Sequence, residues 1–383
     1  MADNSKEQSG ANKNKGKYIF FFILLALVVI IALVIVVNNK SKNNSANKAK
    51  SENSAKKDSG NNAGKDDKSD KGGSSSDSVE VIENTILTED GYLIELLKGS
   101  EYSEKRIDTN VGLIEKFVKT YSEHLGEDKV SLFTVPDKVT IFKDKLPEGL
   151  DTDTKAENEK YAEMVAYLDK SLSDKVANYH NLLSDLEKEK DEYIYYRTDH
   201  HWTSMGALCA YESIAKLTKN ESLNDTSDLK SESVTDSFNG SDYVRSKIET
   251  KKDEIHRYNI TPADTAKAVI DDSGEKKKID SIYDEKALES EDPYTYFMSG
   301  NYGAIDVKTK TKNGKTLLLV KDSYSNSLVP FLTMNYERIF MVDLRYANMS
   351  VTEYLGEVGK PDDVIIVLNQ SNIMSDRHLY NLQ

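Results

Sequence analysis

The sequence predicts an α/β domain with helices on both faces of a parallel sheet, preceded by one transmembrane helix and a disordered linker. Three observations support this architecture. An uncharged apolar segment lies near the N-terminus, a strongly polar stretch follows it, and apolar runs alternate with helical patterns near the C-terminus. Strands buried on both faces read as continuous apolar runs, and alternation with helices is typical of parallel sheets. We place this domain at residues 79–383.

Residues 1–17 are a short tail, and the 20 residues from Tyr18 to Val37 contain no charge, proline or glycine. One helix of that length crosses the hydrocarbon core of a bilayer. The polar run Asn38-Asn39-Lys40 follows instead of a small-residue cleavage site, which predicts an uncleaved single-pass anchor. Lysines flank both ends, so charge leaves the orientation open, and we expect the C-terminal domain on the outside of the cell membrane.

Residues 38–78 are polar, with nothing more apolar than alanine, and cannot bury enough surface to offset their ordering entropy. We expect them to form a flexible tether. The chain has 51 Lys and Arg against 65 Asp and Glu, a net charge of −14, which argues against nucleic-acid binding. Its one cysteine, Cys209, excludes an intrachain disulfide and is expected to be buried on a helix.

The first half of the domain contains two predicted strands and two predicted helices. Val130–Val135 is an apolar run and Tyr193–Tyr196 is an aromatic run, and both are predicted as strands. Glu157–Lys190 has apolar residues at three- and four-residue steps, which predicts a helix. Thr203 can cap a second helix that begins at Ser204.

Residues 218–294 are polar, and we expect either a long excursion or lid within the domain, or a loosely ordered surface insertion. After this segment, apolar runs again alternate with helical patterns. Three apolar runs predict strands: Thr316–Val320, Arg338–Val342 and Val364–Leu368. Two segments between them predict helices: Ser325–Asn335, which Pro330 should kink or shorten, and Val351–Val358.

Polar residues follow each predicted strand at the point where it ends. In an open parallel sheet these carboxyl ends meet at one edge, which is where binding sites form. The clusters are Arg197–His201, Lys321-Asp322-Ser323, Asp343-Leu344-Arg345 and Asn369-Gln370. We therefore expect their side chains to lie close together.

Three of these residues suit nucleophilic catalysis. A serine hydroxyl becomes reactive when a base takes its proton and a carboxylate fixes the tautomer of that base. Ser323 stands where a strand turns into a helix, whose N–H groups can receive an oxyanion. Asp199 and His201, two residues apart, would share one side of an extended stretch. The alternatives are structural, with Ser323 and Asp199 as helix caps and His201 packed against Trp202.

No metal ion or cofactor is predicted. Adjacent His200 and His201 should diverge, and no second cluster of His and Cys accompanies them. The other histidines stand singly in polar contexts and are expected to be structural or solvated: His124, His180, His256 and His378.

Three motifs carry a family resemblance: the run from Arg197 to Thr203 (RTDHHWT), Lys321–Tyr324 (KDSY) and Asp343–Tyr346 (DLRY). Through them the chain resembles the DHHW protein family, which is similar to the SGNH-hydrolase-like domains of the alginate O-acetylation machinery. The resemblance extends over nearly all of residues 79–383 and implies an SGNH-hydrolase-like fold. It also implies roles for three residues: Ser323 as the nucleophile, His201 as the general base and Asp199 as its orienting partner.

Relatives act in the O-acetylation of cell-surface polysaccharides, often beside a membrane-bound O-acyltransferase that brings the acyl group across the bilayer. The resemblance therefore implies a membrane-anchored O-acetyltransferase or acetylesterase, and it is the resemblance alone that favours transfer. A variant of this function carries D-alanyl or another acyl group to teichoic-type polymers, and only the acyl donor separates the two. A different class of function also fits the acidic domain, namely a catalytically silent module that binds glycan or scaffolds an envelope complex.

The sequence departs from the usual SGNH pattern in two ways. The Asp-x-His pair precedes the serine, an order that the acetylation relatives share, and Lys321 stands where a typical Gly-Asp-Ser motif has glycine, so we expect a different oxyanion hole. Arg345 and Asn369 are candidates for holding substrate or oxyanion, although Arg345 could pair with an acidic neighbour and Asn369 could cap its strand. Tyr324 and Trp202 are predicted either as a platform for a sugar ring or as core.

Overall fold

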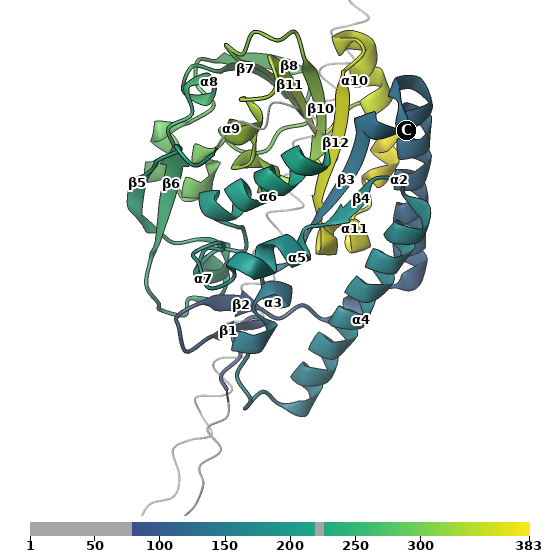
Figure 1. The fold of residues 1–383 in the computed structure, drawn as a ribbon. Coiled ribbons are helices and arrows are strands. Elements are labelled where there is room, and N and C mark those ends of the chain that lie inside the picture. Colours follow the sequence, from purple (N-terminus) through teal and green to yellow (C-terminus); the bar gives the residue numbers. More distant parts are fainter. Residues whose placement is uncertain (1–78, 219–225) are drawn as a thin grey trace, which may run out of the picture. The chain divides into compact units, whose positions relative to one another are not determined.

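An eight-stranded mixed sheet forms the centre of the fold, with helices on both of its faces (Figure 1). The structure, a computed structural model, describes residues 79–218 and 226–383. The predicted anchor at residues 18–37 and the predicted linker at residues 38–78 lie outside the described residues. Within the described part of the chain, no helix is both long enough and apolar enough to cross a bilayer.

The strands follow one another in the order β4-β3-β12-β10-β11-β9-β7-β8. The first five run parallel: β4 (Tyr179–Asn181), β3 (Val130–Val135), β12 (Asp363–Asn369), β10 (Thr316–Lys321) and β11 (Arg338–Asp343). Every residue of β3 and β12 is buried, as their continuous apolar runs predict. The four strands predicted in this half of the sheet are confirmed.

The other half of the sheet is antiparallel, so the prediction of a parallel sheet is wrong there. Its strands are β9 (Ala304–Lys308), β7 (Lys267–Asp272) and β8 (Glu275–Ile279). The turn between β7 and β8 needs positive φ angles, which Ser273 and Gly274 adopt at +54° and +93°. The edge strand β8 reads Glu-Lys-Lys-Lys-Ile and is largely exposed, so the sequence lacks the apolar run that would mark it as a strand.

Helices cover both faces of the sheet (Figure 1). On one face lie α2 (Glu104–Leu125), α4 (Thr152–Lys175), α10 (Val351–Val358) and α11 (Gln370–Ser375), and on the other lie α6 (Ser204–Leu217) and α9 (Val329–Leu332). The side chains that cap five of these helices accept a backbone N–H of the first turn: Ser103, Asp151, Thr203, Ser350 and Asn369. Cys209, predicted to be buried, is partly exposed on α6.

Smaller elements surround the main sheet. Four short helices are α3 (Lys138–Ile141), α5 (Leu183–Leu186), α7 (Ser241–Ser246) and α8 (Thr261–Asp264). Two small antiparallel sheets pair β1 (Thr85–Leu87) with β2 (Leu93–Glu95), and β5 (Ser231–Phe238) with β6 (Asp253–Tyr258).

The helix predicted over residues 157–190 is too long at its C-terminal end. Helix α4 ends at Lys175, Val176 is extended, and Tyr179–Asn181 form β4 beside β3. Over only a few residues, a helix and a short half-buried strand can have apolar residues at similar intervals. Periodicity alone therefore does not distinguish the strand at Tyr179–Asn181 from a continued helix.

Two further segments differ from their predictions. Tyr193–Tyr196 joins no sheet and makes a single bridge, Tyr195 to Trp202. The helix predicted over Ser325–Asn335 is split into a 3₁₀ turn, Ser323–Asn326, and the short α9, whose first turn contains Pro330. Proline lacks an N–H and suits a helix start, which explains this break.

The polar segment 218–294 is more ordered than expected in its described part, residues 226–294. It supplies β5, α7, β6 and α8, and then β7 and β8 of the main sheet. The expectation of an excursion or a loose insertion is therefore wrong for this part. Its polar composition reflects exposed edge strands that bury only a few apolar side chains, such as Ile255 and Ile270.

A buried carboxylate in this segment holds the loop that follows Tyr196. Asp253, fully buried in β6, accepts the backbone N–H groups of Arg197 and Thr198 at 2.7 Å each. It also accepts the hydroxyls of Thr198 and Tyr193. Four donors would therefore lose their acceptor if this carboxylate were removed.

We expect Asp253→Ala to lower the free energy of unfolding by about 3 kcal/mol, because it leaves buried donors without partners. Urea unfolding followed by circular dichroism measures this change. The matched control is Asp280→Ala, whose side chain is 93% exposed and pairs with Lys267 on the surface, and which should leave stability almost unchanged. Equal stability of the two variants would contradict the role assigned to Asp253.

Candidate active site

The structure brings Ser323, His201 and Asp199 into one hydrogen-bonded row. Ser323 Oγ lies 2.8 Å from His201 Nε2, and His201 Nδ1 lies 2.6 Å from Asp199 Oδ1. All three are buried, with 8%, 5% and 3% of their surface exposed. Ser323 follows β10, whereas the other two belong to a loop 122 residues away in the sequence. This is the geometry that a serine nucleophile with a histidine base requires.

The Asp199 carboxylate is held on both of its oxygens. Oδ1 accepts the backbone N–H of His201 at 2.9 Å as well as the imidazole, and Oδ2 accepts the N–H of Ser241 at 2.8 Å. Gly240 lies so close that a Cβ there would sit 2.1 Å from the Cβ of Asp199. The loop is therefore a turn that folds Asp199 back onto His201, not the extended stretch that the sequence predicts.

Burial and neighbouring charges set the protonation of this pair. Burial lowers the pKa of His201 to about 4; the charge on His200 acts in the same direction, and Asp199 opposes both. Burial alone would raise the pKa of Asp199, but the imidazoles of His201 and His200 hold it well below its usual range. At neutral pH Asp199 is thus ionised and His201 is neutral. An Nδ1–H donated to Asp199 leaves Nε2 free to accept the proton of Ser323.

The position of Ser323 is fixed by the residue before it. The buried Asp322 carboxylate accepts the N–H of Tyr324 at 3.1 Å, which caps the 3₁₀ turn that begins at Ser323. Its other oxygen accepts the N–H of Asn369 at 2.7 Å and the side-chain amide of Asn372 at 2.8 Å. Asp322 therefore ties the end of β10 to the end of β12.

Ser323 opens onto a cavity of about 120 Å³. Its lining combines polar and charged groups with a few apolar ones: Glu95, Leu97, Asp137, Lys138, Val139, His200, Asp242, Tyr324, Arg345, Asn369, Ser371 and Asn372. Polar clusters that follow several different strands thus meet at one edge, as the carboxyl-end rule predicts.

Arg345 lines the cavity and is oriented by Asp343. Its Nε and Nη2 donate to the two oxygens of Asp343 at 2.9 and 2.8 Å. Lys321 lies on the other side of Asp343 at 3.4 Å and donates to Asn301 and Asn326. Burial lowers the pKa of Lys321, and Asp343 partly offsets that effect. The Lys321 side chain is fully buried and is not among the residues that line the cavity, so it does not occupy the place of an oxyanion.

The other predicted ligand-binding residues have structural contacts. Asn369 caps α11 by accepting the N–H of Asn372 at 3.3 Å, and its amide donates to the carbonyl of Val135. Trp202 is fully buried and donates to the carbonyl of Tyr324 at 2.9 Å, so it offers no sugar platform. Tyr324 touches the cavity, but its hydroxyl donates to the carbonyl of His200 at 2.8 Å.

Sequence reasoning missed a buried lysine that holds the catalytic loop. Lys138 Nζ donates to the carbonyl oxygens of Asp199 at 2.7 Å, Tyr196 at 3.2 Å and Arg197 at 3.4 Å. It also pairs with the fully buried Asp242 at 2.6 Å. Lys138 lies just beyond the carboxyl end of β3, so the rule that found the other clusters could have found it.

A second missed residue is Tyr294, whose ring stacks on His201 with centroids 3.9 Å apart and planes 9° apart. Nothing in the sequence distinguishes it from the other tyrosines. The histidines predicted to be structural contact nearby groups: His180, His256 and His378 each contact a carboxylate, and His124 contacts the carbonyl of Thr120.

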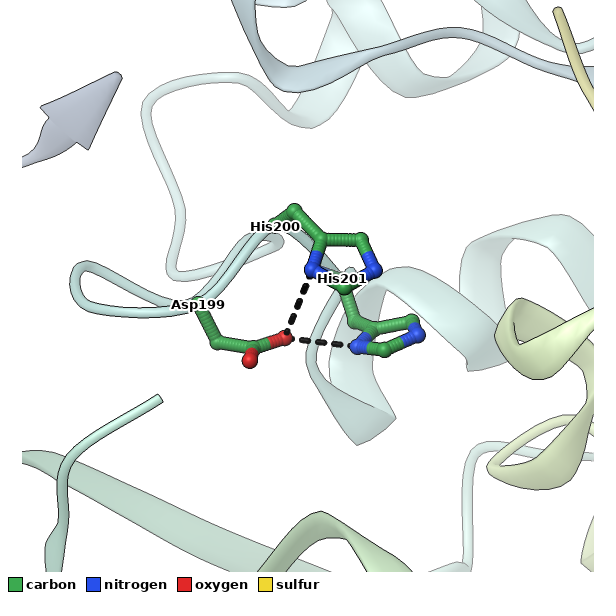
Figure 2. A group of neighbouring side chains, drawn as sticks. All are labelled: Asp199, His200 and His201. Atoms are coloured by element: carbon green, nitrogen blue, oxygen red, sulfur yellow. Dashed lines mark hydrogen bonds and ion pairs between the residues drawn. The ribbon is translucent and has the colours of Figure 1, made fainter. Parts of the chain in front are cut away.

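Among residues 79–218 and 226–383, one group of side chains brings three possible metal ligands together: Asp199, His200 and His201 (Figure 2). Figure 2 shows both histidines directed at the same carboxylate oxygen of Asp199, His200 at 3.8 Å and His201 at 2.6 Å. His200 Nδ1 is also 2.6 Å from Ser241 Oγ. A metal would have to displace these hydrogen bonds, so the donors suit proton transfer better than coordination.

Comparisons with known proteins agree with the predicted resemblance. The family model described as "DHHW protein" matches residues 158–342, which include Asp199, His201 and Ser323. A crystal structure of a DHHW family protein from Eubacterium siraeum is 23% identical, with a TM-score of 0.63, over 80% of this chain and 96% of that one.

Bacillus cereus PatB1 has a similar fold, at 22% identity and a TM-score of 0.60, over 78% of this chain and 100% of that one. A second PatB1 structure, with a sulfonyl adduct, is 21% identical, with a TM-score of 0.61, over 78% and 99%. The O-acetyltransferase domain of Pseudomonas putida AlgJ is more remote, at 14% identity and a TM-score of 0.47, over 78% and 95%.

No curated protein shows significant similarity to this chain. The chain shares its fold with a DHHW protein of known structure, and residues 158–342 match the sequence pattern of the DHHW family.

Proposed function

We propose that this protein is a serine-dependent acyl-ester enzyme that transfers acetyl groups to a cell-surface polysaccharide. The observation that carries the proposal is the row Ser323–His201–Asp199, with hydrogen-bond distances of 2.8 and 2.6 Å. The choice of acetyl as the transferred group and of polysaccharide as the acceptor rests on the resemblance to proteins of polysaccharide O-acetylation. The PatB1 structure with a sulfonyl adduct adds support, because sulfonyl reagents trap activated nucleophiles.

In the first step, Ser323 Oγ attacks the carbonyl carbon of an acyl ester while His201 Nε2 takes its proton. The C–O bond of the donor breaks, and the departing alcohol takes the proton back from His201, which leaves an acetyl-serine. We assign two donors to the oxyanion. They are the Ser323 N–H and the Arg345 guanidinium. Ser323 begins a 3₁₀ turn, where the first N–H groups have no partner within the turn.

In the second step, a sugar hydroxyl gives its proton to His201 Nε2 and attacks the acetyl carbon. The bond from that carbon to Ser323 Oγ breaks, and Oγ takes the proton back from His201. Water could do the same, which would make the protein an esterase. Transfer is favoured when the acyl-enzyme is kept from bulk water. With 8% of Ser323 and 5% of His201 exposed, the site meets that condition in part.

The location follows from residues outside the described structure. We propose that residues 18–37 anchor the chain in the cell membrane and that residues 38–78 tether the domain on the outer side. A membrane-bound O-acyltransferase is the partner that could deliver the acyl group there. The acceptor polymer would then lie within reach of the tether.

Incubation of the protein with methanesulfonyl fluoride should add one sulfonyl group to Ser323, because the serine oxygen displaces fluoride when His201 accepts its proton. Intact-mass spectrometry followed by peptide mapping measures the adduct. Ser323→Ala should abolish it.

The matched control for this experiment is Ser325→Ala, which removes a buried hydroxyl without a hydrogen-bond partner from the same turn and should leave labelling intact. If wild-type protein is not labelled, or is labelled equally after Ser323→Ala, the enzyme proposal fails. Retained polysaccharide binding would then favour the silent glycan-binding module.

The rate of labelling should fall at low pH with a midpoint near pH 4, because protonation of His201 removes the base and burial lowers its pKa to about 4. The neutral, reactive form therefore persists well below the usual histidine range. Second-order rate constants measured from about pH 3.5 to about pH 8 give the profile. Circular dichroism at each pH separates protonation from unfolding, and a midpoint near 6.5 would contradict the buried base.

The full chain should sediment with membranes and be released by detergent but not by high salt, because an apolar helix holds it. A variant that lacks residues 1–37 should remain in the supernatant. Immunoblots of both fractions measure the distribution. Salt-released full-length protein would argue against the anchor.

A further inference from the structure

We propose that Tyr294 is a positioning residue for the reaction, in that its ring holds His201 in line with Ser323 and its hydroxyl holds the backbone of Ser323. This inference rests on the proposed function, and it goes beyond the Ser-His-Asp row. Tyr294 is 4% exposed and contacts both residues between which the proton moves, the imidazole of His201 and the backbone carbonyl of Ser323.

The ring of Tyr294 restricts the orientation of the imidazole. The two planes are 9° apart and the centroids 3.9 Å apart, which is face-to-face contact. The other aromatic neighbours meet His201 at steeper angles: Tyr324 at 62° and His200 at 36°. Rotation of the imidazole out of the line from Asp199 to Ser323 would drive it into the Tyr294 ring.

The hydroxyl of Tyr294 acts on the nucleophile side. It donates to the carbonyl oxygen of Ser323 at 3.1 Å and lies 3.3 Å from Ser327 Oγ. Trp202 Nε1 donates to the same Ser327 hydroxyl at 3.0 Å. One side chain therefore links the face of the base to the turn that carries the nucleophile.

The stacked ring also favours the charge that forms during the reaction. When His201 accepts the serine proton it becomes an imidazolium, which burial disfavours. The face of a phenol ring is negative and attracts a cation lying over it. Because His201 is neutral before the proton moves, this attraction appears only as the reaction proceeds and so accelerates it.

Tyr294 comes from a rigid turn at the end of the segment 218–294. It is the second residue of a 3₁₀ turn, Pro293–Tyr296, and Asp292 caps that turn by accepting the Tyr294 N–H at 3.2 Å. Pro293 restricts the backbone just before the ring. The segment thereby contributes a fixed wall of the site in place of the lid that the sequence suggested.

The experiment compares three variants of the full-length protein by the rate of Ser323 labelling with methanesulfonyl fluoride. Tyr294→Leu removes ring and hydroxyl and should slow labelling by about 30-fold, the upper range for a desolvated cation over a ring. Tyr294→Phe restores the ring and should recover most of the rate. The matched control, Tyr296→Leu, removes a fully buried tyrosine of the same turn that stacks on Tyr283 and not on His201. It should label at nearly the wild-type rate.

A second readout does not depend on activity. The proton between His201 Nδ1 and Asp199 should give a far-downfield NMR signal that is absent from His201→Gln. We expect Tyr294→Leu to broaden or remove this signal, and Tyr294→Phe and Tyr296→Leu to keep it.

Two outcomes would overturn the inference: an unchanged signal and rate in Tyr294→Leu, or equal losses in Tyr296→Leu, which would indicate general loosening. If wild-type protein is never labelled, the proposed function fails instead. The NMR signal then still decides whether Tyr294 positions His201.

Discussion

The site depends on buried charges that hold a loop outside the main sheet. Residues 197–201 carry the base and its carboxylate, yet their backbone lies outside the main sheet. Buried polar backbone groups need partners, and here charged side chains provide them. Lys138 binds the carbonyl oxygens of Tyr196, Arg197 and Asp199, and Asp253 binds two N–H groups of the loop. These contacts help to fix the position of the imidazole relative to Ser323.

The same burial determines how the site can work. Removing His201 from water makes its charged form unfavourable, so the base stays neutral and ready to accept a proton. That gain carries a cost, since the imidazolium must form in the same dry surroundings. Ionised Asp199 at one nitrogen and the Tyr294 ring against the face both lower that cost. The surroundings of the base are therefore matched to the charged state that appears only during proton transfer.

Some elements and site residues could be predicted from the sequence, and others could not. Strands β3, β10, β11 and β12 were predictable because continuous apolar runs identify strands buried on both faces. Ser323 follows β10 as predicted, whereas Asp199 and His201 follow Tyr193–Tyr196, which is not a strand of the sheet, and their loop is a turn. The edge strand β8 was missed because exposed lysines fill it, and the adjacent strand β7 was missed because its apolar run is short and flanked by charged residues. Lys138 was missed because a lysine usually lies on the surface, although its place just beyond the end of β3 satisfies the rule that found the other clusters.

Lys321 shows why a departure from a motif need not disturb the site. Successive side chains of a strand point to opposite sides, so the last residue of β10 can direct its side chain away from the cavity that Ser323 faces. Its ammonium reaches Asp343, which also holds Arg345 by two hydrogen bonds. The two cations outweigh the effect of burial and keep the pKa of Asp343 below its usual value. An ionised Asp343 orients Arg345 at the cavity that Ser323 also lines. Lys321 therefore contributes to the site indirectly, through Asp343.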